Sequence, residues 1–258
     1  MTQDDVLVIA GRSIRNRFFL GTGKFSSREL VGEAIRAAGI EVVTVALRRI
    51  EPERRSESIL HQIPAGVVRL VNTSGARDAQ EALRLARLAR ATGLGDWIKV
   101  EVVDDSKYLL PDNDETVRAT ELLTADGFVV LPYIFPDLYI ARRLQRAGAA
   151  ALMPLGSPIG SNQGLQTREF IRILIAETGL PVIVDAGLGA PSQAAESMEM
   201  GAAAVLANTA VATAADPVQM ARAFSLAVAA GRAARLAGLP PPGLPSASSP
   251  MSGFLTQP

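Results

Sequence analysis

The chain has 258 residues, of which 48% are hydrophobic and 20% charged, a composition that suits a globular protein with a substantial core. Basic and acidic residues both number 26, so the formal charge gives no reason to expect a nucleic acid or an anionic membrane as a partner. With no cysteine and a single histidine, His61, the chain cannot use disulfides, a thiolate nucleophile or a cluster of histidine metal ligands.

The amino terminus is polar and acidic through Asp5, unlike a signal peptide. No apolar run reaches the length that crosses a bilayer. We therefore expect a cytoplasmic protein that binds neither membrane nor nucleic acid and uses no metal or organic cofactor.

Apolar runs then alternate with helical patterns along the chain. Segments 6–9 and 13–17 predict a small hairpin. Eight apolar runs predict core strands at 18–20, 41–47, 67–71, 97–103, 128–133, 149–155, 181–184 and 203–207. Apolar residues at helical spacing predict helices at 26–39, 78–91, 114–125, 138–147, 167–178, 192–200 and 216–237. Ser26 is the expected N-cap of the first helix, because Glu29 follows three residues later.

This alternation predicts a parallel sheet covered by helices, and eight strands are the number of a closed (β/α)8 barrel, or TIM barrel. A doubly wound open sheet is the alternative, but Gly21-Thr22-Gly23 lacks the third glycine of a dinucleotide-binding turn. We expect one barrel domain over residues 1–238, with the hairpin at its amino terminus. Residues 239–258 are rich in Pro, Ser and Gly and predict a flexible tail.

The fourth predicted strand carries a lysine and a glutamate two residues apart, Lys99 and Glu101. Strand side chains alternate between faces, so these two share one face. A structural ion pair is the simpler interpretation for an isolated strand. In a barrel the chemistry lies at the carboxyl ends of the strands, where burial lowers the pKa of a lysine and frees its amine to attack a carbonyl. We therefore favour a Schiff-base lysine, with the carboxylate transferring protons.

The ends of the last three strands carry small residues with free backbone N–H groups. They are the segment 156–160, which ends in Gly160, then Ala186 with Gly187, and Asn208 with Thr209. Barrels often bind phosphate at their last strands, so together these three segments favour a phosphate site over the alternative that the glycines only serve tight turns. Asp185 ends the seventh strand and is either a second acid–base group or the cap of the next helix.

Several long segments resemble the thiazole synthase family of bacterial thiamin biosynthesis. The matching segments are 19–24 (FLGTGK), 43–49 (VTVALRR), 97–102 (WIKVEV), 109–112 (LLPD), 153–161 (MPLGSPIGS), 184–189 (VDAGLG) and 208–211 (NTAV). Arg48 and Arg49 lie in one of these segments, but chemistry assigns them no catalytic role, and we expect a salt bridge or a subunit contact.

The resemblance implies that Lys99 forms an imine with the ketone of 1-deoxy-D-xylulose 5-phosphate and that Glu101 and Asp185 handle protons. It also implies a phosphate site made by the residues Gly160, Ala186, Gly187, Asn208 and Thr209. The other implied substrates are dehydroglycine and sulfur carried by the thiocarboxylate terminus of a small ubiquitin-like protein. A homo-oligomer, either a dimer or a tetramer, is expected. A class I aldolase-like enzyme and a non-catalytic barrel that binds sugar phosphate remain the alternatives.

Overall fold

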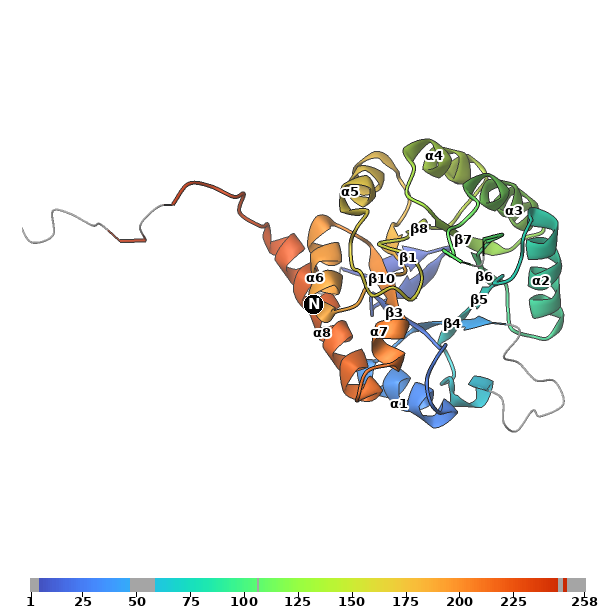
Figure 1. The fold of residues 1–258 in the computed structure, drawn as a ribbon, viewed down its shortest axis with the longest axis horizontal. Coiled ribbons are helices and arrows are strands. Elements are labelled where there is room, and N and C mark those ends of the chain that lie inside the picture. The colour runs from blue at the N-terminus through green and yellow to red at the C-terminus, as the bar shows by residue number, and fades with distance from the viewer. Residues whose placement is uncertain (1–4, 47–58, 106, 246–247, 250–258) are drawn as a thin grey trace, which may run out of the picture.

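The computed structural model describes residues 5–46, 59–105, 107–245 and 248–249, and these form a (β/α)8 barrel (Figure 1). Eight parallel strands make one sheet in the order β8-β7-β6-β5-β4-β3-β10-β9. Parallel bridges from Leu152 to Val182 and from Leu155 to Asp185 join the two edges, so the sheet closes on itself. The predicted fold class is confirmed.

The barrel strands are short and mostly buried. Their bounds are β3 Phe18–Gly21, β4 Val42–Ala46, β5 Val68–Asn72, β6 Trp97–Val100, β7 Val129–Ile134, β8 Met153–Pro154, β9 Ile183–Val184 and β10 Ala204–Ala207. Inner side chains such as Phe19, Leu70, Leu131 and Met153 fill the amino-terminal half of the barrel. The carboxyl-terminal half is therefore left for polar side chains.

Helices pack outside the strands and bury their apolar faces against the sheet (Figure 1). Their bounds are α1 Arg28–Ala38, α2 Ala79–Ala91, α3 Asn113–Ala125, α4 Leu138–Arg146, α5 Arg168–Glu177, α6 Pro191–Met200, α7 Thr209–Ala212 and α8 Pro217–Ala237. Aspartates cap the amino ends of α2, α3, α4 and α8, each accepting a hydrogen bond from a first-turn N–H group.

Three details differ from the sequence predictions. Ser27, not Ser26, is the N-cap of α1, and its side chain accepts a hydrogen bond from the N–H of Leu30. The strand β6 ends at Val100, before Glu101, because only an isolated bridge from Ala76 to Val102 continues the pairing. The short helix α7 was not predicted, since four residues are too few to show helical spacing.

His61 lies in a 3-10 helix, η3 (Ile59–Gln62), and is exposed. Arg48 and Arg49 lie outside the described residues, so their predicted salt bridge or subunit contact stays a prediction.

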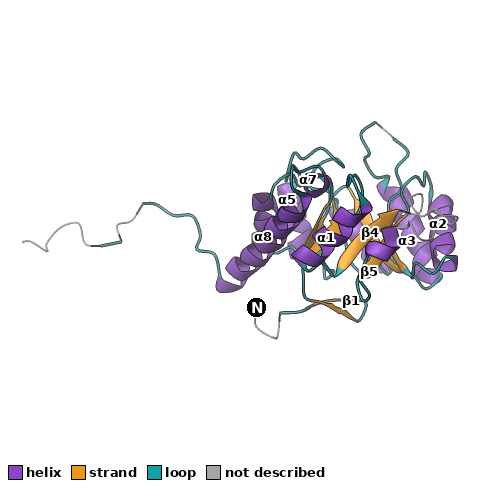
Figure 2. Ribbon diagram, turned by 90° about the horizontal axis from the view of Figure 1, so that it is seen from below, coloured by secondary structure: helices purple, strands orange, loops and turns teal. Residues whose placement is uncertain are grey.

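The amino-terminal hairpin covers one end of the barrel. It consists of β1 (Leu7–Ile9) and β2 (Arg12–Ile14), paired antiparallel as expected. Leu7, Ile9 and Ile14 join the core of the barrel interior. Figure 2 shows β1 at the end opposite α7, so the hairpin closes the amino-terminal end and leaves the other end open.

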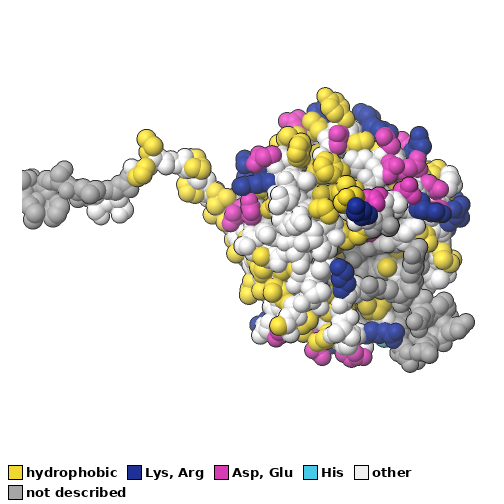
Figure 3. Space-filling view, in the orientation of Figure 1, with side chains coloured by type: hydrophobic (Ala, Val, Ile, Leu, Met, Phe, Trp, Pro, Cys, Tyr) yellow, Lys and Arg dark blue, Asp and Glu magenta, His cyan; other side chains and the backbone are white. Residues whose placement is uncertain are grey.

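The carboxyl-terminal segment leaves the barrel after α8. Residues 239–245 have no helix or strand, are exposed, and extend away from the barrel (Figure 1). Charged side chains of both signs are interspersed around the edge of the molecule (Figure 3), as the equal numbers of acids and bases suggest. Within the part of the chain that the structure describes, no helix has the length and apolar character needed to cross a membrane.

Candidate active site at the open end of the barrel

Lys99 occupies the centre of the open end. On β6 it lies between Asn72 of β5 and Leu131 of β7 in the strand register. Its side chain reaches a cavity of about 280 Å3 at the carboxyl ends of the strands, yet Lys99 is only 4% exposed. The ammonium group therefore lies at the floor of a cavity and is shielded from bulk water.

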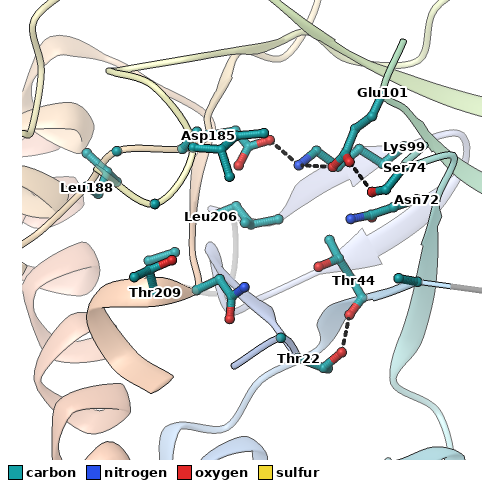
Figure 4. A pocket seen from close by; sticks show the side chains of 18 of the residues that line it. Thr22, Thr44, Asn72, Ser74, Lys99, Glu101, Asp185, Leu188, Leu206 and Thr209 are labelled. Atoms are coloured by element: carbon teal, nitrogen blue, oxygen red, sulfur yellow. Dashed lines mark hydrogen bonds and ion pairs between the residues drawn. The ribbon is translucent and has the colours of Figure 1, made fainter. Parts of the chain in front are cut away.

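Two carboxylates hold the lysine (Figure 4). Lys99 Nζ lies 2.9 Å from Glu101 Oε1 and forms a second, shorter ion pair with Asp185 Oδ2. Glu101 is 7% exposed and Asp185 is 2% exposed. The three side chains that the sequence suggested from two separate segments thus form one buried cluster, with two acids for one base.

The electrostatics of this cluster differ from the expectation for a buried lysine. Burial pulls the pKa of Lys99 down, but the nearby carboxylates of Asp185 and Glu101 outweigh burial and hold that pKa above its ordinary value. Burial also raises the pKa of Asp185, although Lys99 opposes this effect. Lys99 therefore keeps its proton in the free protein, and Asp185 is the neighbouring carboxylate whose affinity for a proton is increased by burial.

Glu101 is fixed by the turn that follows β5. Thr73 Oγ1 accepts a hydrogen bond from the Glu101 N–H at 2.8 Å and donates one to the Glu101 carbonyl at 3.0 Å. Ser74 Oγ donates to Glu101 Oε2. The sequence did not reveal this role of Thr73 and Ser74, because the spacing within one strand cannot show which neighbouring loop it meets.

Asp185 is not a helix cap, which was the alternative for this residue. The next helix, α6, has Ala190 as its N-cap, and Gln193 Oε1 accepts from the N–H groups of Gly189 and Ala190. The Asp185 N–H instead donates to the Pro154 carbonyl at 2.9 Å, continuing the barrel pairing between β8 and β9. The carboxylate is therefore free to face Lys99.

All five residues predicted to bind phosphate line the same cavity as Lys99. They are Gly160, Ala186, Gly187, Asn208 and Thr209. Gly160 and Gly187 have φ angles of 76° and 77°, and Ala186 has a φ of 62°, so three of the five adopt left-handed backbone. A side chain at Gly187 would collide with Ser157, so this glycine permits a close approach of two loops.

Tyr133 completes the surroundings of the lysine. It is fully buried on β7, and Lys99 Nζ lies 5.2 Å from the centre of its ring. Burial raises the pKa of the Tyr133 phenol, and Asp185 and Glu101 raise it further, so the hydroxyl stays neutral. The face of a neutral aromatic ring attracts a cation at this distance and favours the charged form of Lys99.

Comparison with known proteins connects this geometry with a family. The family model for "Thiazole biosynthesis protein ThiG" matches residues 8–250. The chain belongs to the thiazole synthase family. Two curated relatives named thiazole synthase, from Pelotomaculum thermopropionicum and Moorella thermoacetica, are each 63% identical, covering 98% and 97% of this chain and 99% of each relative. The chain is therefore an enzyme of thiamin biosynthesis, a thiazole synthase.

Solved structures agree with the fold. A crystal structure of the Amycolatopsis orientalis BexX/CysO complex contains a chain 36% identical to this one, with a TM-score of 0.81 over 93% of this chain and 98% of that one. A structure of mandelate oxidase is 21% identical, with a TM-score of 0.63 over 90% of this chain and 80% of that one, which shows the fold alone. Family membership favours the first functional hypothesis over an aldolase-like enzyme or a non-catalytic barrel.

Proposed function

We propose that this thiazole synthase works through an imine on Lys99, with Glu101 and Asp185 as its proton-transfer groups. The observation that carries the proposal is the buried cluster of one lysine and two carboxylates at the floor of the cavity. The ketone substrate is 1-deoxy-D-xylulose 5-phosphate, and dehydroglycine and a sulfur donor complete the thiazole.

The lysine must first lose a proton, because only a neutral amine attacks a carbonyl. Asp185 is the acceptor, since burial raises its pKa and it already contacts Lys99 Nζ. Attack on the ketone carbon then forms a C–N bond, and the carbonyl oxygen leaves as water after it receives protons from the cluster. The cationic imine that results takes the place of the ammonium between the two carboxylates.

The next step removes a proton from the sugar carbon beside the imine, so that the carbonyl can migrate along the chain. Glu101 is placed for this step because Thr73 and Ser74 hold it at the edge of the cavity. A positioned general base of this kind contributes about 10²–10⁴-fold in rate.

The substrate phosphate binds on the opposite side of the cavity, at the five predicted residues. Supporting this assignment, Gly160, Ala186 and Gly187 have left-handed backbone and line one cavity with Asn208 and Thr209, and turns of this kind can present backbone N–H groups to an anion. The Asn208 side-chain oxygen is buried and has no hydrogen-bond partner within the described part of the chain, and the amide nitrogen of the same side chain is the group that would donate to a phosphate oxygen.

Sulfur arrives from a separate small protein whose carboxyl terminus enters the cavity as a thiocarboxylate. Two features support this: the chain has no cysteine to carry sulfur, and the relative that is 36% identical was solved as a complex of BexX with CysO. We also propose a homo-oligomer, a cytoplasmic location, and a domain that ends at residue 238. Of the tail expected over residues 239–258, residues 246–247 and 250–258 lie outside the described residues.

Borohydride reduction with intact-protein and peptide mass spectrometry tests the proposal. Incubation with 1-deoxy-D-xylulose 5-phosphate should give one trapped adduct, on Lys99. An adduct on Lys24 or Lys107 with Lys99 unmodified would refute the assignment. Turnover with free sulfide at the rate supported by the carrier protein would refute the sulfur route.

A further inference from the structure

Lys24 has an unusual backbone for its residue type. It lies just after β3 and has a φ of 65°, in the left-handed region that residues with a side chain adopt only at a cost. Such strain persists where the surrounding structure needs a side chain in one place. Ala186, one of the residues assigned to phosphate and part of the cavity lining, has the same kind of backbone.

The strained turn sends the lysine across the end of the barrel to residues far away in the sequence. Lys24 Nζ donates a hydrogen bond to Thr209 Oγ1 at 3.1 Å. It also lies directly over Gly160, because a side-chain carbon at that glycine would come within 2.9 Å of Nζ. The ammonium group therefore contacts two of the five residues assigned to the phosphate, one from each of two loops.

The charged residues that line the cavity leave a bound phosphate without a positive partner. In the described part of the chain, the charged side chains that line the cavity are Lys99, Glu101 and Asp185. They carry one more negative charge than positive, and Lys99 already pairs with both acids. A phosphate group brings further negative charge. Lys24 forms no ion pair with any residue that the structure describes, so its charge is free for a ligand.

We propose that Lys24 is a phosphate-binding residue that covers the substrate phosphate at Gly160 and Thr209. The inference rests on the proposed function and adds the counter-charge that backbone N–H groups and an amide cannot supply. The small size of Gly160 then has a second reason: any side chain there would displace the ammonium from its place.

The test uses two ketoses that differ only in the phosphate. The half-saturating concentration for the borohydride-trapped adduct on Lys99 is measured with 1-deoxy-D-xylulose 5-phosphate and with 1-deoxy-D-xylulose. Lys24→Met should raise this concentration about 10- to 100-fold for the phosphorylated ketose, the loss expected for a hydrogen bond between charged groups, and leave the other ketose unchanged. Lys24→Arg should recover part of the loss, because it keeps the charge.

Lys107→Met is the matched control, since Lys107 lies in the loop after β6 with its ammonium over the Tyr108 ring, whereas Lys24 lies at Gly160 and Thr209. It should change neither value. Equal weakening of both ketoses by Lys24→Met, or no weakening of either, would overturn the inference. If the wild-type protein formed no adduct on Lys99, the proposed imine would fail by itself. Calorimetric titration with inorganic phosphate would then still decide the inference, which fails if Lys24→Met binds phosphate as tightly as wild type.

Discussion

The two ends of the barrel each hold a cluster of three charged side chains, with opposite proportions, and the cluster at the closed end is only partly buried. At the open end one cation, Lys99, lies between two carboxylates. At the closed end one carboxylate, Asp5, lies between two guanidinium groups: 2.8 Å from Arg17, and 2.6 Å from Arg232, which also donates to its second oxygen. Arg17 is 6% exposed, about as buried as Lys99.

The two clusters differ in whether their basic side chains can lose a proton. Arginine stays protonated at any ordinary pH, so the Asp5 cluster can only hold elements together. It joins the start of the chain to β3 and α8, and Arg17 also donates to the Ala203 carbonyl at 2.8 Å. Lysine can lose its proton, and two acids beside it give the proton somewhere to go. The same kind of ion pairing therefore holds elements together at one end and, in the proposed mechanism, supplies proton-transfer groups at the other.

Replacing Lys99 should have the largest effect. Lys99→Ala and Lys99→Arg should both abolish the trapped adduct and thiazole formation, because a methyl group has no amine and a guanidinium cannot form the imine. Mass spectrometry after borohydride treatment and a product assay check this. The arginine variant keeps the positive charge between the two acids, so measurable turnover by it would show that Lys99 acts through charge alone.

Neutralising either carboxylate should slow turnover about 10²–10⁴-fold without preventing imine formation. Glu101→Gln should still trap the adduct on Lys99. Asp185→Asn should also lower the pKa of Lys99, because it removes the largest effect that opposes burial, so the rate of imine formation should become less dependent on high pH. A pH profile of adduct formation that is the same in Asp185→Asn and wild type would argue against proton transfer between the two.

At the closed end, Asp5→Asn should lower the free energy of unfolding by about 3 kcal/mol, because it leaves the buried charge of Arg17 without its partner. Trapping of the Lys99 adduct should not change. Urea denaturation measures the first and mass spectrometry the second. Asp114→Asn, which breaks the exposed ion pair with Arg143, is the control and should cost less than about 1 kcal/mol.

Asp5 also sets a pH dependence of stability. The hydrogen bond from Arg232 holds the pKa of Asp5 below its usual range, with Arg17 adding to the effect against burial. A carboxylate with a lowered folded-state pKa stabilises the fold above its unfolded pKa, and this stability disappears as the pH falls through the folded value. The free energy of unfolding of wild type should therefore fall toward that of Asp5→Asn below about pH 4. A difference in unfolding free energy between the two proteins that stays constant down to pH 2 would contradict this.

The smallest effect is expected from Ser74→Ala, which removes one hydrogen bond to Glu101. Turnover should fall about tenfold with little change in substrate affinity, since the glutamate is still present but less well held. Steady-state kinetics check this. Ser27→Ala is the control, because its hydroxyl caps α1 away from the cavity and should affect stability but not rate.

Much of the fold could be predicted from local sequence, because strands and helices have different apolar periods. Within the described residues, the eight barrel strands and seven of the eight α-helices were found in this way, and most boundaries agree within a few residues. The errors occur where local pattern is ambiguous. Ser26 and Ser27 are adjacent, and the glutamate three residues after Ser26 pointed to the wrong one. The run 149–155 is apolar throughout, although only Met153–Pro154 forms a regular strand, with isolated bridges at Leu152 and Leu155.

The sequence by itself determined that Lys99 and Glu101 share a face, because the two-residue period of a strand is local geometry. Only the tertiary structure decided that Asp185 meets Lys99, that Ser74 holds Glu101, and that Lys24 reaches Thr209 across the end of the barrel. These contacts join residues from 27 to 185 positions apart. Spacing along a chain carries no information about such pairs. They meet because closing eight parallel strands brings all their carboxyl ends to one opening.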